Sequence, residues 1–221
     1  MDTPRHDHPD LRRDSLSALT SIRKWKSFFL LLAVLCLATH AVAWAAVRFK
    51  WVPAAPRSAA VDAESAATQP DEGDRRQAEK AWNAMRVALP TTEFVGRLSA
   101  LLLCLSLLMA VQIALVGRLP VAGIVQAFFW SLIVLALLMP WERLAPTSTR
   151  LPGVFTDVAA LEMPDEVAGA PSSLSGVVAP LRFVGYPLLA VLILLFANSR
   201  FHRSFREALA QPGANIPMRV V

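Results

Sequence analysis

The chain has 221 residues, of which 55% are hydrophobic and 18% are charged, and its formal net charge is +5. Soluble domains of this size are normally more polar, and the apolar residues here lie in blocks rather than in amphipathic periods, which excludes a soluble helical bundle. The positive charge could suggest nucleic acid, but the basic residues flank apolar segments and no nucleic-acid motif is present, so nucleic acid is not an expected partner.

Residues 1–26 form a polar N-terminal segment with two prolines, four aspartates and six Lys or Arg residues. This composition predicts a disordered tail, which we place in the cytoplasm. His6-Asp7-His8 resembles a fragment of a metal site, but no further ligands lie nearby in the sequence. We therefore interpret it as part of a solvated tail, and no metal or other cofactor is expected.

The first predicted transmembrane helix covers residues 27–47, a run without Lys, Arg, Asp or Glu. Its length is sufficient to cross a hydrocarbon core of roughly 30 Å. A basic flank precedes it, and Trp25 and Trp44 near its two ends are typical of interfacial anchors. Ala41-Val42-Ala43 also fits the cleavage site of a signal peptide, so cleavage stays open, although the long polar segment before the run favours an uncleaved helix.

Residues 48–97 form the first predicted loop, on the extracytoplasmic side. Its beginning is rich in Ala, Pro, Ser and acidic residues, which indicates a flexible spacer. Residues 75–89 carry an apolar stripe that includes Trp82 and Met85, and this spacing predicts an amphipathic helix that Pro90 ends. The stripe either packs on the protein's own membrane or bundle, or it binds a partner.

Two more apolar runs follow, at residues 98–116 and 119–141, and neither contains a charged residue. Each is long enough to cross a membrane, and the connection between them is too short for anything but an antiparallel hairpin. Gly117 suits the end of the first helix and Pro120 suits the first turn of the second. The sequence therefore predicts a tight hairpin of two transmembrane helices at the centre of the chain.

Small residues recur four apart on both arms of this hairpin. Folding the chain about the turn pairs them at matching depth, and small residues let helices in lipid approach closely. The predicted pairs are Ala114 with Gly123, Ala110 with Ala127, and Ser106 with Ser131.

Residues 142–182 form the second predicted extracytoplasmic loop, which contains several acidic residues. The last transmembrane run, residues 183–199, is near the lower length limit for a membrane span. The tail, residues 200–221, begins as a basic amphipathic continuation of the helix, a pattern suited to an anionic leaflet. The basic residues beside the first and last runs indicate that both termini are cytoplasmic, in the cell (inner) membrane.

Four polar residues lie inside the predicted spans: His40, Gln112, Gln126 and Asn198. His40 is the only ionisable one, and its simplest role is a hydrogen bond to a neighbouring helix, because no carboxylate is present for a proton relay. Gln112 should meet the first or last span, close to Asn198. Such groups fix helix packing more often than they bind a substrate.

The sequence contains no phosphate loop, nucleophile elbow, metalloprotease motif or paired cysteines, so no catalysis is expected. Cys36 and Cys104 lie in apolar runs and are interpreted as buried small hydrophobes. The chain is thus predicted to be an all-α polytopic membrane protein, and a non-enzymatic accessory or scaffold subunit. Its expected partners are the lipid bilayer and other membrane subunits or copies of itself.

Two alternatives remain open at this stage. A small oligomeric transporter or channel would need a polar pathway, and the four intramembrane polar residues are the only lining candidates. A membrane-surface enzyme would require the acidic residues of the second loop, at 157–166, to converge with an arginine.

Overall fold

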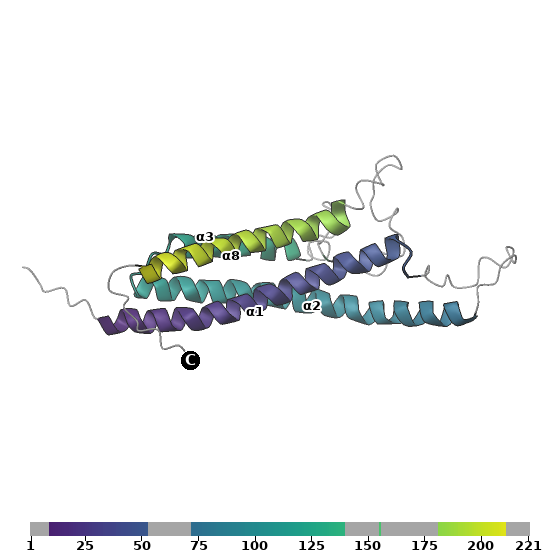
Figure 1. Ribbon diagram of the computed structural model, residues 1–221, viewed down its shortest axis with the longest axis horizontal. Helices are drawn as coiled ribbons and strands as arrows, with labels where there is room; N and C mark the ends of the chain where they lie inside the picture. Colours follow the sequence, from purple (N-terminus) through teal and green to yellow (C-terminus); the bar gives the residue numbers. More distant parts are fainter. Residues whose placement is uncertain (1–8, 53–71, 140–154, 156–180, 211–221) are drawn as a thin grey trace, which may run out of the picture. The chain divides into compact units, whose positions relative to one another are not determined.

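The computed structural model describes residues 9–52, 72–139, 155 and 181–210, and these residues are almost entirely helical, with no strand among them. The elements, in chain order, are α1 (Pro9–Arg48), α2 (Glu72–Val116), α3 (Ala122–Leu138), the short π-helical turn η1 (Leu181–Gly185) and α8 (Tyr186–Ala210) (Figure 1). The all-α class predicted from the sequence is therefore confirmed.

Three helices are long and apolar enough to cross a membrane, within Asp14–Arg48, Arg76–Val116 and Phe183–Ala210. The remaining helix, α3, is apolar but has only 17 residues, fewer than the 23 expected from the run at 119–141. These helices fit an integral membrane protein, as the composition indicated.

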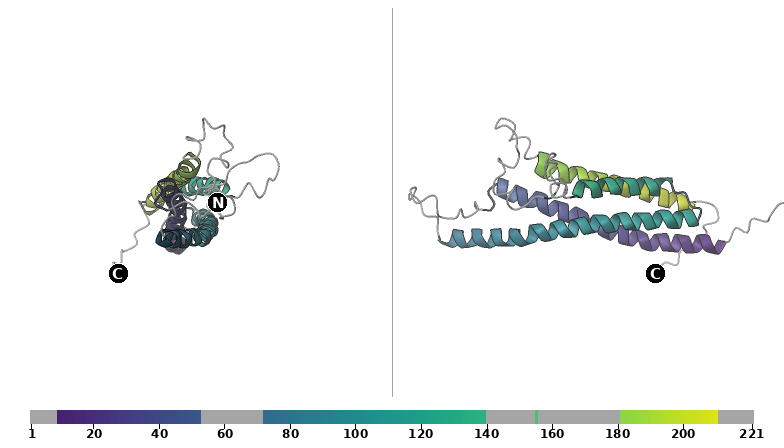
Figure 2. Two further views of the ribbon diagram at one scale, coloured as in Figure 1. Left: turned by 90° about the vertical axis from the view of Figure 1, so that its right-hand side faces the viewer. Right: turned by 180° about the vertical axis from the view of Figure 1, so that it is seen from behind.

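The chain divides into two compact units, each built from segments that lie far apart in the sequence. Unit 1 comprises Met1–Ala33, Leu98–Leu137 and Ala190–Val221, and unit 2 comprises Val34–Arg97 and Leu138–Leu189. Within unit 1, the second part of α2, all but the end of α3 and the second part of α8 run alongside the first part of α1 (Figure 2). Helices α1, α2 and α8 therefore each contribute to both units.

Several predicted segments lie outside the described residues. They are the metal-like fragment at 6–8, the spacer at 53–71, most of the second loop with its acidic residues at 157–166, and the end of the tail at 211–221. The described part of the tail continues α8 as a helix to Ala210, as the amphipathic spacing predicted.

Helix α1 begins at Pro9, so the expected disorder over 1–26 is wrong for residues 9–26. Proline is favoured in the first turn of a helix because its missing N–H has no helical partner there. Leu16 and Leu19, three residues apart, are fully buried in unit 1. These two leucines give this segment a buried inner face, and burying that face stabilises the helix.

Helix α2 continues through Pro90, so the expected end of a separate helix at this residue is also wrong. Proline removes one backbone hydrogen bond and distorts the preceding turn. The hydroxyl groups that follow bond to other carbonyls than the one that Pro90 leaves without its helical donor, because Thr91 Oγ1 donates to that of Val87 at 2.7 Å and Thr92 Oγ1 lies 2.9 Å from the carbonyl of Ala88. Burial of Trp82 and Leu89 inside unit 2 favours the continuous helix instead. As a result, residues 72–97 form one helix with the span that follows, rather than part of a loop.

The apolar stripe before Pro90 packs inside unit 2, which is one of the two alternatives that the sequence left open. Trp82 is buried, and Leu89 joins Trp44 and Phe183 in a hydrophobic cluster with Met85 beside it. The rings of Trp44 and Phe183 are stacked, with their centroids 5.8 Å apart. This cluster holds the first part of α2 against the end of α1 and against η1.

The hairpin turn is a Schellman motif centred on Arg118. The amide of Leu119 donates to the carbonyl of Ala114 at 2.9 Å, and Arg118, with φ of 50°, takes the left-handed position. We expected Gly117 to end the helix because of its conformational freedom, but glycine is required at this position because of close packing. A Cβ on Gly117 would lie 2.8 Å from the Cβ of Ser15, so glycine lets α1 approach the turn.

Candidate functional site

His40 occupies a buried polar position in unit 2, with 2% of its surface exposed. Its Nε2 lies 3.1 Å from Thr92 Oγ1 on α2, which is a hydrogen bond to a neighbouring helix of the kind that the sequence predicted. The Thr92 hydroxyl has a single proton and also lies within 3.0 Å of the carbonyls of Ala88 and Leu89. When that proton goes to a carbonyl, His40 Nε2 is the donor and Nδ1 is the free acceptor.

The Nδ1 atom of His40 is buried and has no hydrogen-bond partner among the described residues. The ring of Phe155 packs edge-on against the imidazole, with the centroids 4.9 Å apart. An aromatic neighbour excludes water from this side of the histidine. The site therefore contains one satisfied nitrogen and one buried nitrogen that no described residue satisfies.

Arg97 extends the His40 site through the same phenylalanine. Its guanidinium carbon lies 5.5 Å from the centroid of the Phe155 ring, its Nε donates to the carbonyl of Leu138 at 3.0 Å, and it forms an ion pair with Glu93 at 2.6 Å. The sequence pattern placed Arg97 and Glu93 in a loop, so both residues were missed. Their spacing of four, typical of an ion pair on a helix, was the available signal.

Gly96 brings α1 and α2 together beside this site. A Cβ at Gly96 would lie 2.7 Å from the Phe155 ring and 3.1 Å from the Cβ of Cys36. Cys36 and Cys104 are both free and buried, as the sequence predicted for small hydrophobes. The residue at position 96 thus sets how closely the two helices approach.

A second buried polar contact joins α1 and α8 in unit 1. Lys26 is only 1% exposed, and its ammonium donates to Asn198 Oδ1 and lies 4.3 Å from the centroid of the Phe201 ring. One turn earlier on α1, Arg23 lies over the ring of Phe205 at 5.3 Å. Two cations of α1, one turn apart, therefore rest on two rings of α8 that are also one turn apart.

In the sequence Lys26 stands out only as part of a basic flank, so its contact with Asn198 was missed. Its spacing from buried Leu19, seven residues earlier, places both on one side of α1 and was the available signal. Among the described residues, no carboxylate contacts the ammonium of Lys26. The amide oxygen and the ring face, which are neutral, stabilise its charge instead.

The small residues of the hairpin are mostly buried in unit 1. Ala110, Ala114 and Ala127 are fully buried, as is Ser131, and the hydroxyl of half-buried Ser106 donates to the carbonyl of Leu102. This burial is compatible with the predicted pairing of the two arms, which itself stays a prediction.

Gly123, one of these small residues, lies against α8. A Cβ at this position would be 2.7 Å from the Cβ of Ser204 and 3.1 Å from the carbonyl oxygen of Arg200. Ser204 Oγ in turn donates to the carbonyl of Pro120 at 3.0 Å. Gly123 therefore permits close packing of α3 and α8, and Trp130 adds an edge-on contact with the ring of Phe196 on the same pair of helices.

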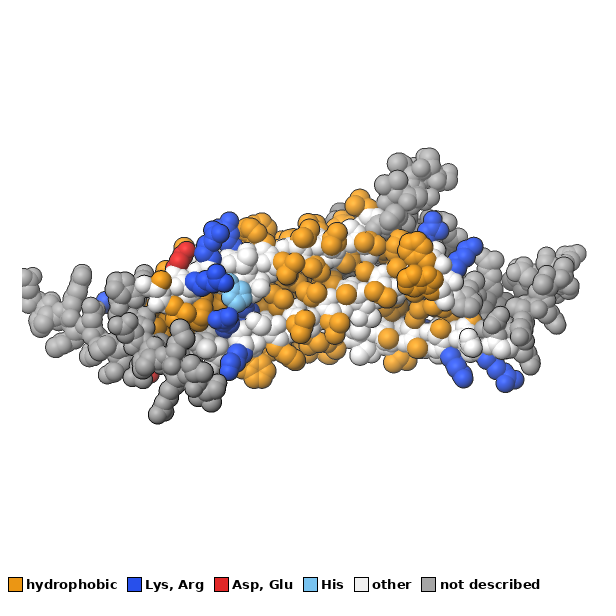
Figure 3. All heavy atoms as spheres, viewed as in Figure 1, with side chains coloured by type: hydrophobic (Ala, Val, Ile, Leu, Met, Phe, Trp, Pro, Cys, Tyr) orange, Lys and Arg blue, Asp and Glu red, His pale blue; other side chains and the backbone are white. Residues whose placement is uncertain are grey.

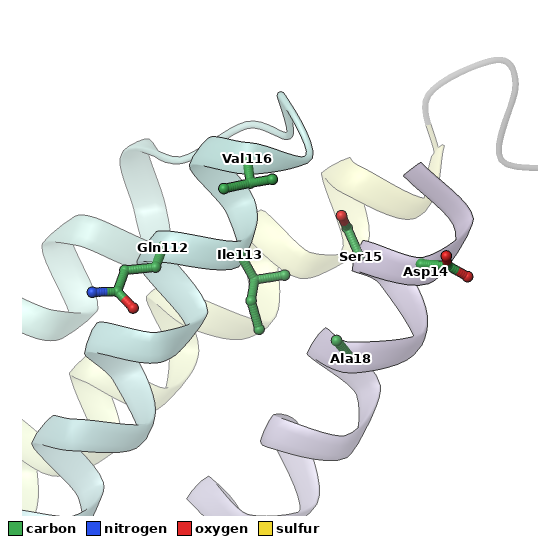
Figure 4. A pocket seen from close by; sticks show the side chains of 6 residues that line it. All are labelled: Asp14, Ser15, Ala18, Gln112, Ile113 and Val116. Atoms are coloured by element: carbon green, nitrogen blue, oxygen red, sulfur yellow. The ribbon is translucent and has the colours of Figure 1, made fainter. Parts of the chain in front are cut away.

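Gln112 and Gln126 are both exposed, and the structure brings neither to Asn198 through a hydrogen bond. Gln112 borders a shallow, mainly apolar hollow of about 330 Å³ between α1 and α2, and its predicted contact with the first or last span stays a prediction. Figure 4 shows the Gln112 amide turned away from α1 and the carboxylate of Asp14 turned away from the hollow. The polar side chains that border this hollow do not converge on a ligand position.

The described residues contain no group of three or more His, Cys, Asp or Glu side chains that could hold a metal ion. The two buried polar contacts, at His40 and at Lys26, are thus the main chemical features of this part of the chain. Comparisons with protein-family models, with curated proteins and with solved structures found no match.

Proposed function

We propose that this chain is a non-enzymatic accessory or scaffold subunit of a membrane complex, and that the part of α2 before its apolar span contacts a protein partner. The length of α2 carries this proposal. The helix has 45 residues, whereas about 20 are enough to cross a bilayer. Residues 72–97 thus extend a membrane helix by several turns of additional, rigid helix.

The two sides of this additional helix differ in character. One side packs inside unit 2 through the buried residues Ala78, Trp82 and Leu89. The other side is polar and exposed, and it includes Gln77, Glu79, Lys80 and Asn83. An exposed polar face on a rigid helix suits specific contact with a protein outside the hydrocarbon region.

The polar residues of the spans support a packing role rather than a transport path. His40 is bonded to Thr92 and Asn198 to Lys26, each within its own unit. Among the described residues, no hydrogen bond links any two of the four polar candidates His40, Gln112, Gln126 and Asn198. A conducting pathway needs polar groups in sequence along its length.

Purification of the full chain from its native membrane in mild detergent tests this proposal. We expect a protein partner to co-purify in a fixed ratio, measured by size-exclusion chromatography and mass spectrometry. The variant Glu79→Lys/Lys80→Glu reverses two exposed charges at constant net charge and should lose the partner. The matched control Arg206→Glu/Glu207→Arg exchanges a similar exposed pair on α8 and should retain it.

A chain that purifies alone would contradict the scaffold proposal. Ion or solute flux in liposomes containing only this protein, abolished by Gln112→Leu, would instead support the transporter alternative. Equal loss of the partner in both charge-exchange variants would show that the exposed face of α2 is not the contact.

A further inference from the structure

Unit 1 has a marked excess of positive charge. Its described side chains include seven Lys or Arg residues but only two carboxylates, Asp14 and Glu207. The cations are Arg23, Lys24, Lys26, Arg118, Arg200, Arg203 and Arg206. None of the seven forms an ion pair within the described part of the chain. No described carboxylate of unit 1 therefore neutralises these cations.

Helix contacts gather six of these cations, which we call the cationic rim: Arg23, Lys24, Arg118, Arg200, Arg203 and Arg206. The buried contact of Lys26 with Asn198 fixes α1 to α8, and Ser204 fixes α8 to the hairpin turn at Pro120, two residues after Arg118. Arg200 is half-buried and the other five are exposed. Figure 3 shows Lys and Arg side chains over the first part of α1 and the last part of α8, at the left of the view, beside apolar surface.

The backbone at Arg118 is consistent with a requirement for charge in the rim. Its φ of 50° is a left-handed conformation that glycine adopts at less cost than any residue with a Cβ. An arginine at this position therefore retains a positive charge despite a local preference for glycine. A strained residue of this kind supports a functional hypothesis when a separate observation agrees with it.

Exposed aromatic side chains give that separate observation. Trp25, between Lys24 and Lys26, is 62% exposed, and its ring contacts those of Phe28 and Phe29 at 6.5 and 6.0 Å. Exposed tryptophan next to basic residues is typical of the interface between the hydrocarbon core and the lipid headgroups. The cationic rim thus lies at the depth of the headgroups, where phospholipid phosphates are the abundant anions.

We propose that the cationic rim binds the phosphate groups of anionic phospholipids and that α1, the hairpin turn and α8 together form this lipid site. Arginine suits this role because its planar guanidinium can donate two hydrogen bonds to one phosphate. The half-buried Arg200 also lies over the ring of Phe196 at 4.9 Å, which orients its side chain. The site is independent of the protein partner proposed for α2.

The test places the full chain in nanodiscs of phosphatidylcholine that contain an increasing share of fluorescent phosphatidylglycerol. It measures how much phosphatidylglycerol the chain retains at each share. The variant Arg203→Gln/Arg206→Gln removes two exposed charges, so it should fold normally. Its apparent affinity for phosphatidylglycerol should fall roughly 10-fold or more, because each basic residue near an anionic surface contributes about 1 kcal/mol. The control Arg76→Gln/Arg86→Gln removes the same charge from exposed positions of unit 2 and should change the affinity less than two-fold.

Two further measurements test whether the bound anion is the lipid. Raising NaCl to about 0.5 M should release phosphatidylglycerol from the unmodified chain, since screening weakens contacts between exposed charges. Inorganic phosphate at millimolar concentration should not displace the lipid. Equal losses in the two variants, retention that is insensitive to salt, or displacement by inorganic phosphate would each overturn the proposal of an anionic-lipid site.

Discussion

Lys26 in unit 1 and His40 in unit 2 are both buried polar residues of α1, but they differ in charge and in the groups that contact them. Lys26 is a cation held by an amide oxygen and an aromatic face, with no carboxylate in contact among the described residues. His40 can be neutral, and the cation nearby, Arg97, has its own carboxylate in Glu93. The buried cation of unit 1 therefore depends on neutral groups, whereas the cation near His40 in unit 2 has a carboxylate partner.

This difference indicates which contacts are sensitive to the loss of one partner. A buried charge that loses its acceptor bears a large desolvation cost. A neutral histidine that loses one hydrogen bond bears a small one, since hydrogen bonds between membrane helices are weak on average. The lysine contact of unit 1 should thus be less tolerant than the histidine contact of unit 2.

The largest expected effect is that of Asn198→Leu, which leaves the ammonium of Lys26 without its acceptor. We expect a loss of about 2 kcal/mol in the free energy of unfolding, less than for a fully enclosed pair because a lysine near a helix end can extend to the interface. Thr92→Val, which removes the partner of His40, should cost about 0.6 kcal/mol. Reversible unfolding by SDS in mixed micelles measures both losses.

The double variant Lys26→Met/Asn198→Leu provides the control for this prediction. It replaces the buried polar contact with apolar side chains of similar size, and such replacements are often neutral. Its stability should return to within about 1 kcal/mol of the unmodified chain. If the double variant is as unstable as Asn198→Leu, side-chain shape rather than the unpaired charge explains the loss.

The next largest effect concerns Gly123 and Gly96, the two glycines at which helices approach each other closely. A Cβ at Gly123 would meet the Cβ of Ser204 and a backbone carbonyl, whereas a Cβ at Gly96 would meet first the far edge of the Phe155 ring. A ring edge can move more easily than a backbone. Gly123→Ala should therefore cost about 1 kcal/mol after the gain in helix propensity, and Gly96→Ala should be close to neutral.

The same SDS titration distinguishes these glycine variants. A larger loss for Gly96→Ala than for Gly123→Ala would show that the Phe155 ring is fixed more firmly than the contact of α3 with α8. Gly123→Ser adds a hydroxyl to the same Cβ and should be at least as destabilising as Gly123→Ala.

The membrane helices could be predicted because an uncharged apolar run of about 20 residues is typical of a membrane span and rare in soluble chains. The runs at 27–47 and 98–116 lie within α1 and α2, and the run at 183–199 covers the end of η1 and most of α8. The beginning of α1 and the passage of α2 through Pro90 were not expected. Local rules favour disorder before residue 27 and a helix end at proline. Tertiary burial of Leu19 in α1 and of Leu89 in α2 outweighs those preferences.

The polar contacts were harder to predict, because each depends on a partner far away in the sequence. His40 stood out as an ionisable residue in an apolar run, but nothing near it indicated Thr92. Lys26 looked like an ordinary interfacial cation, and its partner Asn198 is 172 residues away. A sequence shows the charge of such a residue, whereas its burial depends on which helices pack together.

The smallest expected effect concerns the two cations in left-handed conformations, Arg118 in unit 1 and Lys50 in unit 2. Arg118→Gly and Lys50→Gly should each stabilise the protein by about 0.5 kcal/mol, because relief of strain slightly exceeds the added entropy of the unfolded chain. The two variants should differ in lipid binding. Only Arg118→Gly removes a charge from the cationic rim, so only it should lower the retention of phosphatidylglycerol while raising stability in SDS titrations. A fall in retention for both variants would mean that total charge, rather than the position of Arg118, governs binding of the lipid.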